Sequence, residues 1–198
     1  MSENQINPHA DLNPSFWVYL FGNRRNRITL WIAGICFLIQ FSVFKYFYPF
    51  ASYIHGDSFV YLSIADRNSD IESYMVGYGR FLRLFSVFSN VDAALVAFQY
   101  IMIQVSALFF LFTVFYICRP GKVVQVLLLG FMILNPLFLH LANLVSSDGF
   151  FMALSFIWFT LLLWILQRPS IRLLAVHAVV LFVVFTVRYN ALIYPFIA

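Results

Sequence analysis

Long apolar runs separated by short polar breaks dominate the chain. A transmembrane helix needs about 20 mostly apolar residues, and five windows with few or no charged residues approach or exceed that length. They are Ile28–Phe44, Ala93–Cys118, Val123–Leu139, Gly149–Gln167 and the short Ile171–Val187. The runs lack the alternation of apolar and polar positions that strands of a membrane barrel require. The pattern therefore predicts an all-α, polytopic transmembrane helix bundle with about five crossings.

The polar segments between these windows define the organisation of the chain. Residues 1–27 form a short polar tail, and residues 28–198 form one transmembrane domain without an internal repeat or a linker. Residues 51–91 form the only large loop, whereas the other connections are short, as between antiparallel neighbouring helices. Within this loop, the spacing of apolar residues predicts amphipathic helices at 58–65 and 78–88.

The second loop helix has a marked division of its residues between two sides. Helical spacing places four apolar residues on one face, namely Phe81, Leu84, Phe85 and Phe88. Arg80 and Arg83 lie toward the other side. This division is typical of a helix lying in the headgroup layer of a membrane, and the two arginines are candidates for binding an anionic substrate.

Composition supports the membrane assignment and excludes other classes. Hydrophobic residues make up 63% of the chain and charged residues 10%, against about 45–50% and about 25% in soluble domains. So few charged residues cannot cover the surface of a soluble domain, and so apolar a chain is not disordered. Cys36 and Cys118 both lie in apolar windows and form no disulfide framework or metal motif. The basic residues are scattered in small groups, which argues against nucleic-acid binding.

The distribution of charge predicts an orientation. Positive residues near helix ends favour the cytoplasmic side. With a cytoplasmic N-terminus, that side receives seven of the twelve, namely Arg24, Arg25, Arg27, Arg119, Lys122, Arg168 and Arg172. Six of the eight acids then fall outside: Asp57, Asp66, Asp70, Glu72, Asp92 and Asp148. We therefore expect a multi-pass protein of the cytoplasmic (inner) membrane, with its N-terminus inside and its functional face outside.

Asp57 is the first candidate for chemistry because it follows the first crossing at the outer membrane surface. Helical spacing places Tyr61 on the same face, so that a carboxylate and a phenol line one cleft. A simpler structural interpretation is that Asp57 is the N-cap of the helix that follows.

Asp148 is the second candidate, since acids at membrane depth are costly and usually functional. It is the next acid after Asp92 and lies where the fourth crossing begins. The preceding Asn135-Pro136 predicts a kink in the third crossing that opens space beside Asp148. The alternative is an N-cap shared with Ser146 or Ser147, or simple exposure at the interface.

Arg188 is the third candidate, at the outer end of the fifth crossing. A cation there would hold a phosphate or pyrophosphate, or would anchor the helix at the interface together with Tyr189. Two acids and a cation, far apart in sequence, thus converge on the outer face. That arrangement suits an enzyme acting on a membrane-embedded phosphorylated lipid.

Residues 25–198 resemble the GT-C superfamily of membrane glycosyltransferases, of the protein O-mannosyltransferase and aminoarabinose-lipid A transferase type (glycosyltransferase family 39-like). The family carries Asp-Glu, a Tyr and Ile-Ala just after its first crossing; Gly56–Ala65 matches this motif, with Ser58 in place of the Glu. Residues 135–148 resemble its Pro-containing helix end followed by a Ser-rich turn and an Asp. Because family members have more crossings, the resemblance implies an N-terminal portion of a longer protein.

The resemblance also implies roles for the candidate residues. Asp57 would be the general base that takes the proton of a lipid, glycan or protein acceptor as the acceptor attacks a polyprenyl-phosphate-linked sugar. The developing phosphate charge would be met by Arg188, Arg80 or Arg83. Asp148 would orient the acceptor or hold a divalent metal such as Mg or Mn, on which family members differ.

Other functions fit the same residues. A lipid-linked-sugar transporter should have polar groups at the bilayer midplane or on both sides, and here the acids lie on one side. A membrane scaffold is a further alternative. An outer-face polysaccharide polymerase would use the same layout with a pyrophosphate-linked oligosaccharide as donor.

Overall fold

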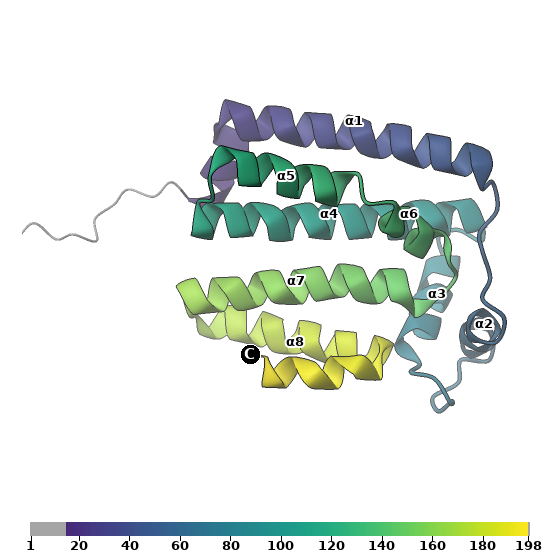
Figure 1. Ribbon diagram of the computed structural model, residues 1–198. Coiled ribbons are helices and arrows are strands. Elements are labelled where there is room, and N and C mark those ends of the chain that lie inside the picture. Colours follow the sequence, from purple (N-terminus) through teal and green to yellow (C-terminus); the bar gives the residue numbers. More distant parts are fainter. Residues whose placement is uncertain (1–14, 198) are drawn as a thin grey trace, which may run out of the picture.

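The computed structural model describes residues 15–197, within which the secondary structure is helical (Figure 1). Long helices lie side by side, and two short ones lie across one end of the bundle. The elements in chain order are η1 (Val18–Gly22, π-helical), α1 (Arg24–Phe47), α2 (Asp57–Arg67), α3 (Gly77–Ser86), α4 (Asp92–Cys118), α5 (Lys122–Ile133), α6 (Pro136–Asn143), α7 (Ser147–Gln167), α8 (Ile171–Val187) and η2 (Tyr189–Phe196, a 3-10 helix).

Four helical segments are long and apolar enough to cross a membrane. They are α1, α4, α5 taken together with α6, and α7. The fifth predicted crossing, α8, has 17 residues and spans about 26 Å at 1.5 Å per residue, slightly less than the bilayer core. The predicted all-α membrane bundle is confirmed, with the fifth helix shorter than the other four.

The third crossing is interrupted at the predicted position. α5 ends at Ile133 and α6 begins at Pro136, because proline has no N–H to continue the hydrogen-bond ladder. The side chain of Asn135 caps α6 by accepting a hydrogen bond from the Leu137 N–H at 3.0 Å. The kink expected at Asn135-Pro136 is therefore present.

The core of the bundle is formed where α4 packs against α7 and α6. Alanines at these contacts are almost completely buried, namely Ala107 on α4, Ala142 on α6 and Ala153 on α7. Lipid chains are as apolar as these side chains, so helix association in a membrane depends on close packing rather than on the hydrophobic effect. Small residues allow that close approach, and they fix the end of α6 and the beginning of α7 against α4.

Charged residues divide between the two ends of the bundle. We call the end that carries α2 and α3, on the right in Figure 1, the acidic end, because it holds every described carboxylate. We call the opposite end the basic end; within residues 15–197 it carries cations and no carboxylate. The basic residues there are Arg24, Arg25, Arg27, Arg119, Lys122, Arg168 and Arg172.

The apolar face predicted for α3 is divided between the core and the surface. Phe81 and Phe85 pack against the core, whereas Leu84 and Phe88 are 63% and 80% exposed. The buried side of α3 instead includes Tyr78 and Leu82. α3 thus packs between α2 and the long helices, with Leu84 and Phe88 left at the surface. That this helix lies in the headgroup layer stays a prediction.

Two glycines allow this packing of α3. A Cβ atom at Gly79 would lie 2.5 Å from Cγ2 of Ile64 on α2. A Cβ atom at Gly77 would lie 2.5 Å from the carbonyl oxygen of Thr186 on α8. The ring of Phe81 stacks on Phe150 of α7, with 4.3 Å between the ring centroids. These contacts hold α3 against three helices at the acidic end.

Candidate functional site

The segment between α1 and α2 is tied to the turn between α6 and α7. The Ser52 N–H donates to the Asn143 carbonyl at 2.8 Å, and the Val145 N–H donates to the Ser52 carbonyl at 3.0 Å. The Asn143 side chain accepts a hydrogen bond from Nζ of Lys45 at 3.0 Å and donates one to the Phe50 carbonyl at 3.2 Å. The first residues of α2 and α7, far apart in sequence, are thereby held at the same end of the bundle.

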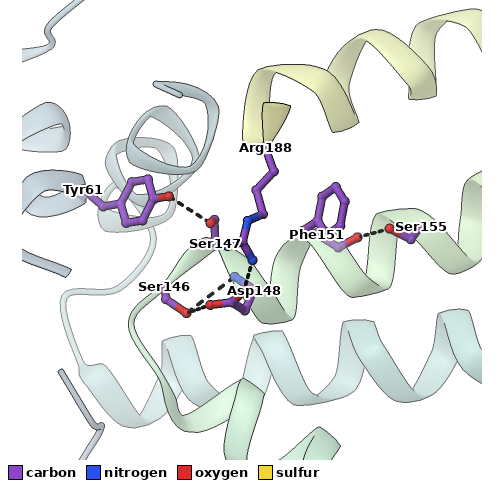
Figure 2. A network of polar contacts seen from close by, with 7 residues as sticks. All are labelled: Tyr61, Ser146, Ser147, Asp148, Phe151, Ser155 and Arg188. Carbon is purple, nitrogen blue, oxygen red and sulfur yellow. Dashed lines mark hydrogen bonds and ion pairs between the residues drawn. The ribbon is translucent and has the colours of Figure 1, made fainter. Parts of the chain in front are cut away.

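Asp148 and Arg188 form an ion pair at this end (Figure 2). Asp148 lies in the first turn of α7, and Arg188 directly follows α8. The other carboxylate oxygen of Asp148 accepts a hydrogen bond from the Ser146 hydroxyl at 3.0 Å. Ser146 is the N-cap of α7, so Asp148 is not the cap itself. The two side chains are 30% and 34% exposed; the predicted convergence of this acid and this cation is therefore present.

A buried hydrogen bond joins α2 to α7 next to this ion pair. The hydroxyl groups of Tyr61 and Ser147 lie 2.9 Å apart, and Figure 2 shows Tyr61 pointing from α2 toward the beginning of α7. Both residues are almost completely buried. Tyr61 therefore connects the helix that begins with Asp57 to the helix that carries Asp148.

Asp57 is held by a residue that the sequence did not indicate. The phenol of Tyr74, in the loop after α2, donates to Oδ1 of Asp57 at 2.8 Å. The pKa of Tyr74 is raised by this hydrogen bond and by the charge of Asp57. The ring of Tyr74 also meets the ring of Tyr61, with 5.7 Å between centroids. Contacts thus run from Asp57 through Tyr74 and Tyr61 to Ser147, beside Asp148.

The N-cap interpretation of Asp57 was wrong. Asp57 is the first residue of α2, and the capping position belongs to Gly56, whose φ is 93°. That φ value is rarely adopted by residues with a Cβ, so Gly56 ends the preceding loop and leaves the Asp57 carboxylate available to Tyr74. A carboxylate in the first turn is still favourable for the helix dipole.

Arg80 and Arg83 lie at the acidic end but away from this network. Arg80 forms an ion pair with Asp70 in the loop. Nη1 of Arg83 donates to the carbonyls of Ala65 at 3.0 Å and Asp66 at 3.3 Å, at the end of α2. Within residues 15–197, neither arginine contacts Asp57 or Asp148. Their described contacts hold α3 and the loop against α2.

A groove of about 290 Å³ extends from the ion pair along α7. Its α7 side is formed by residues at helical spacing of three and four, namely Asp148, Phe151, Met152, Ser155, Phe156 and Phe159. Arg188 lies at the same end as Asp148, and its guanidinium carbon is 5.9 Å from the centroid of the Phe151 ring. The groove is therefore apolar along its length and charged at one end.

The metal expectation at Asp148 has little support from the residues present. Among residues 15–197, no group of three or more His, Cys, Asp or Glu side chains is arranged to hold a metal ion. Asp148 instead has Arg188 and Ser146 as partners. These side chains do not form a metal-binding set.

The missed residues of the site are Tyr74 and Asn143. Both residues contact segments that lie elsewhere in the sequence. Tyr74, in the loop after α2, contacts Asp57 at the start of that helix, and Asn143, at the end of α6, contacts Phe50 in the segment after α1. Neither contact follows from a local spacing, and no sequence signal indicates it.

Comparisons with protein-family models, with curated proteins and with solved structures find no match for this chain. The fold and the site together define an all-α membrane bundle with a partly exposed acid and cation at one end.

Proposed function

We propose that this chain is an integral membrane glycosyltransferase of the GT-C type. It would transfer a sugar from a polyprenyl-phosphate-linked donor to a hydroxyl or amine of a lipid, glycan or protein acceptor. The observation that carries the proposal is the Asp148–Arg188 ion pair at the end of the apolar groove along α7. On the charge distribution, we place this acidic end outside the cytoplasmic membrane.

The groove supports a lipid-linked donor. Phe151, Phe156 and Phe159 give it an apolar wall that a polyprenyl chain would contact from within the bilayer. The donor phosphate would then lie at Arg188, whose guanidinium has further N–H donors besides the Nη1 that pairs with Asp148. Arg188, rather than Arg80 or Arg83, is the cation that stabilises the negative charge developing on the leaving phosphate.

Asp57 is the proton acceptor in this proposal. As the acceptor oxygen or nitrogen attacks the anomeric carbon, its proton passes to the Asp57 carboxylate. The bond between the anomeric carbon and the phosphate oxygen breaks, and polyprenyl phosphate leaves with the electron pair. Tyr74 orients the carboxylate through its 2.8 Å hydrogen bond. The Tyr61–Ser147 hydrogen bond keeps α2 in register with α7.

The test is product formation by the purified chain in lipid bilayers. The wild type, Asp57→Asn and Asp66→Asn are each given a panel of polyprenyl-phosphate sugars with acceptors. Asp66 lies on the same helix and is exposed, so its substitution is a control for charge. Wild type and Asp66→Asn should release polyprenyl phosphate, and Asp57→Asn should be at least about a hundredfold slower, since general-base catalysis contributes about 10² to 10⁴.

Three outcomes would contradict the proposal in different ways. Equal rates for Asp57→Asn and wild type would remove Asp57 from the role of base. Turnover of pyrophosphate-linked oligosaccharides alone would indicate a polysaccharide polymerase. Failure of the wild type to bind or convert any donor would favour a membrane scaffold.

A further inference from the structure

A second groove, of about 440 Å³, lies at the basic end of the bundle, away from the site described above. It is formed where η1 packs beside α4 and the beginning of α1. Its walls are almost entirely apolar and include Trp17, Phe21, Leu30, Val105, Phe109 and Phe112. Trp17 is 61% exposed and stacks on Phe21 with an angle of 2° between the ring planes. In a membrane, such a surface contacts hydrocarbon.

The segment that forms one wall of this groove is a fixed part of the fold. Phe16, directly before Trp17, is buried and packs edge-on against Phe109, Tyr116 and Trp164. The side chain of Asn26 on α1 donates to the Tyr19 carbonyl at 2.9 Å. These contacts hold η1 against α1 and α4, so the groove is preformed.

Exposed arginines lie close in sequence to two residues of the groove, Phe21 and Leu30. Arg24 and Arg27 precede Leu30, one of the groove residues, by six and three positions on α1. Residues three apart on a helix are neighbours on its surface, so Arg27 adjoins Leu30, whereas Arg24 lies nearer the start of α1, three residues after the groove residue Phe21. Both arginines are exposed, and the basic end carries no carboxylate within residues 15–197. The N-terminus of α1 adds a partial positive charge at the same place.

We infer that this groove binds an anionic glycerophospholipid. One acyl chain lies against Trp17, Phe21 and Leu30, and the headgroup phosphate lies at Arg24 and Arg27. The apolar walls account for the chain. The nearby cations, which have no carboxylate at their end of the bundle within residues 15–197, account for selection of a negative headgroup over a zwitterionic one. The site is independent of the proposed glycosyltransferase activity, because it lies at the other end of the bundle.

The experiment measures quenching of Trp17 fluorescence by brominated lipids. The full chain is placed in phosphatidylcholine bilayers that contain an equal, small mole fraction of either phosphatidylglycerol or phosphatidylcholine with brominated acyl chains. The difference between the wild type and Trp17→Phe isolates the signal of Trp17 from that of the exposed Trp31. Brominated phosphatidylglycerol should be enriched about fivefold at Trp17 for each arginine that contacts its phosphate.

A matched pair of variants separates the site from general attraction at the basic end. Arg24→Gln/Arg27→Gln should abolish the preference for phosphatidylglycerol at Trp17. Arg168→Gln/Arg172→Gln removes the same number of positive charges at the junction of α7 and α8. This variant should retain the preference for phosphatidylglycerol at Trp17. Equal quenching by the two brominated lipids in the wild type would overturn the inference, and so would equal loss of preference in both variants. Absence of quenching at Trp17 by either lipid would show that a protein segment fills the groove.

Discussion

The hydroxyl groups of Tyr61 and Ser147 form a buried hydrogen bond of 2.9 Å between helices that begin 90 residues apart, at Asp57 and Ser147. This bond fixes a loop helix, α2, to a membrane-spanning helix, α7. The candidate acid Asp57 and the ion pair of Asp148 with Arg188 thereby belong to one connected set of contacts.

A double-mutant cycle measures this hydrogen bond. The variants Tyr61→Phe, Ser147→Ala and the double variant should give a coupling of about 0.5–1.5 kcal/mol in the free energy of unfolding, the usual net contribution of an intramolecular hydrogen bond. Denaturant titration in mixed micelles provides the measurement. The exposed Tyr189 is the control, since Tyr189→Phe should not couple to Ser147→Ala. Additive effects of Tyr61→Phe and Ser147→Ala would contradict the described contact.

The Asp148–Arg188 pair predicts a characteristic pattern of stabilities. Asp148→Asn leaves a partly buried guanidinium without its counter-charge, which is more costly than removing both charges. The single variant should lose about 1–2 kcal/mol of unfolding free energy, intermediate between exposed and buried pairs. The double variant Asp148→Asn/Arg188→Gln should recover part of that loss in the same titration. A double variant less stable than the single variant would argue against a direct pair.

Close packing of α3 on α2 predicts opposite effects for two glycines. Gly79→Ala places a methyl group 2.5 Å from Ile64 and should destabilise the protein by about 1–3 kcal/mol, as overpacking usually does. At Gly130 of α5 an added Cβ meets no atom within 4 Å. Gly130→Ala should therefore be neutral or stabilising by up to about 1 kcal/mol through helix propensity. Thermal unfolding of the two variants would decide; a neutral Gly79→Ala would contradict the packing.

Tyr53 supplies a prediction about pH. Its phenol donates to Oδ2 of Asp92 at 2.7 Å, and this hydrogen bond, followed by burial and the charge of Asp92, raises the pKa of Tyr53 to about 12. Because the pKa is raised in the folded state, the stabilisation is fully present below the unfolded pKa of about 10 and is lost as the pH rises toward 12.

The pKa of Tyr53 can be isolated by absorbance titration. The difference between the wild type and Tyr53→Phe gives the titration of this one phenol. In the Asp92→Asn background, the same difference should show a pKa lower than about 12, because the carboxylate is gone. Asp66→Asn, which leaves this contact intact, should have no effect. An unchanged pKa in Asp92→Asn would show that Asp92 is not its cause.

The spanning helices were predictable because their ends are marked by charges and by proline. The window Ile171–Val187 coincides with α8, and Ala93–Cys118 differs from α4 by one residue. In the bilayer, a charged residue is costly, so a charge-free run largely defines the helix. The break at Asn135-Pro136 follows from local chemistry in the same way.

The site was predictable only in part. Two helices, α7 and α8, lie between Asp148 and Arg188, and two successive crossings return the chain to the end at which it began. The convergence of the two residues follows from this count. The contact of Tyr74 with Asp57 depends on the path of a loop, and the exposure of Leu84 depends on which side of α3 its neighbouring helices cover. Helical periodicity gives the residues that share a face but not which part of that face is covered.

The central claim is that the groove along α7 binds a lipid phosphate through Arg188. The most direct test compares binding of polyprenyl phosphate with binding of the uncharged polyprenol of the same length, to the wild type and to Arg188→Gln in bilayers. The wild type should bind the phosphate about tenfold to a hundredfold more tightly, since a hydrogen bond to a charged group contributes about 1.5–3 kcal/mol. Arg188→Gln should lose this preference and still bind polyprenol. Equal affinity of the wild type for phosphate and alcohol would contradict the claim.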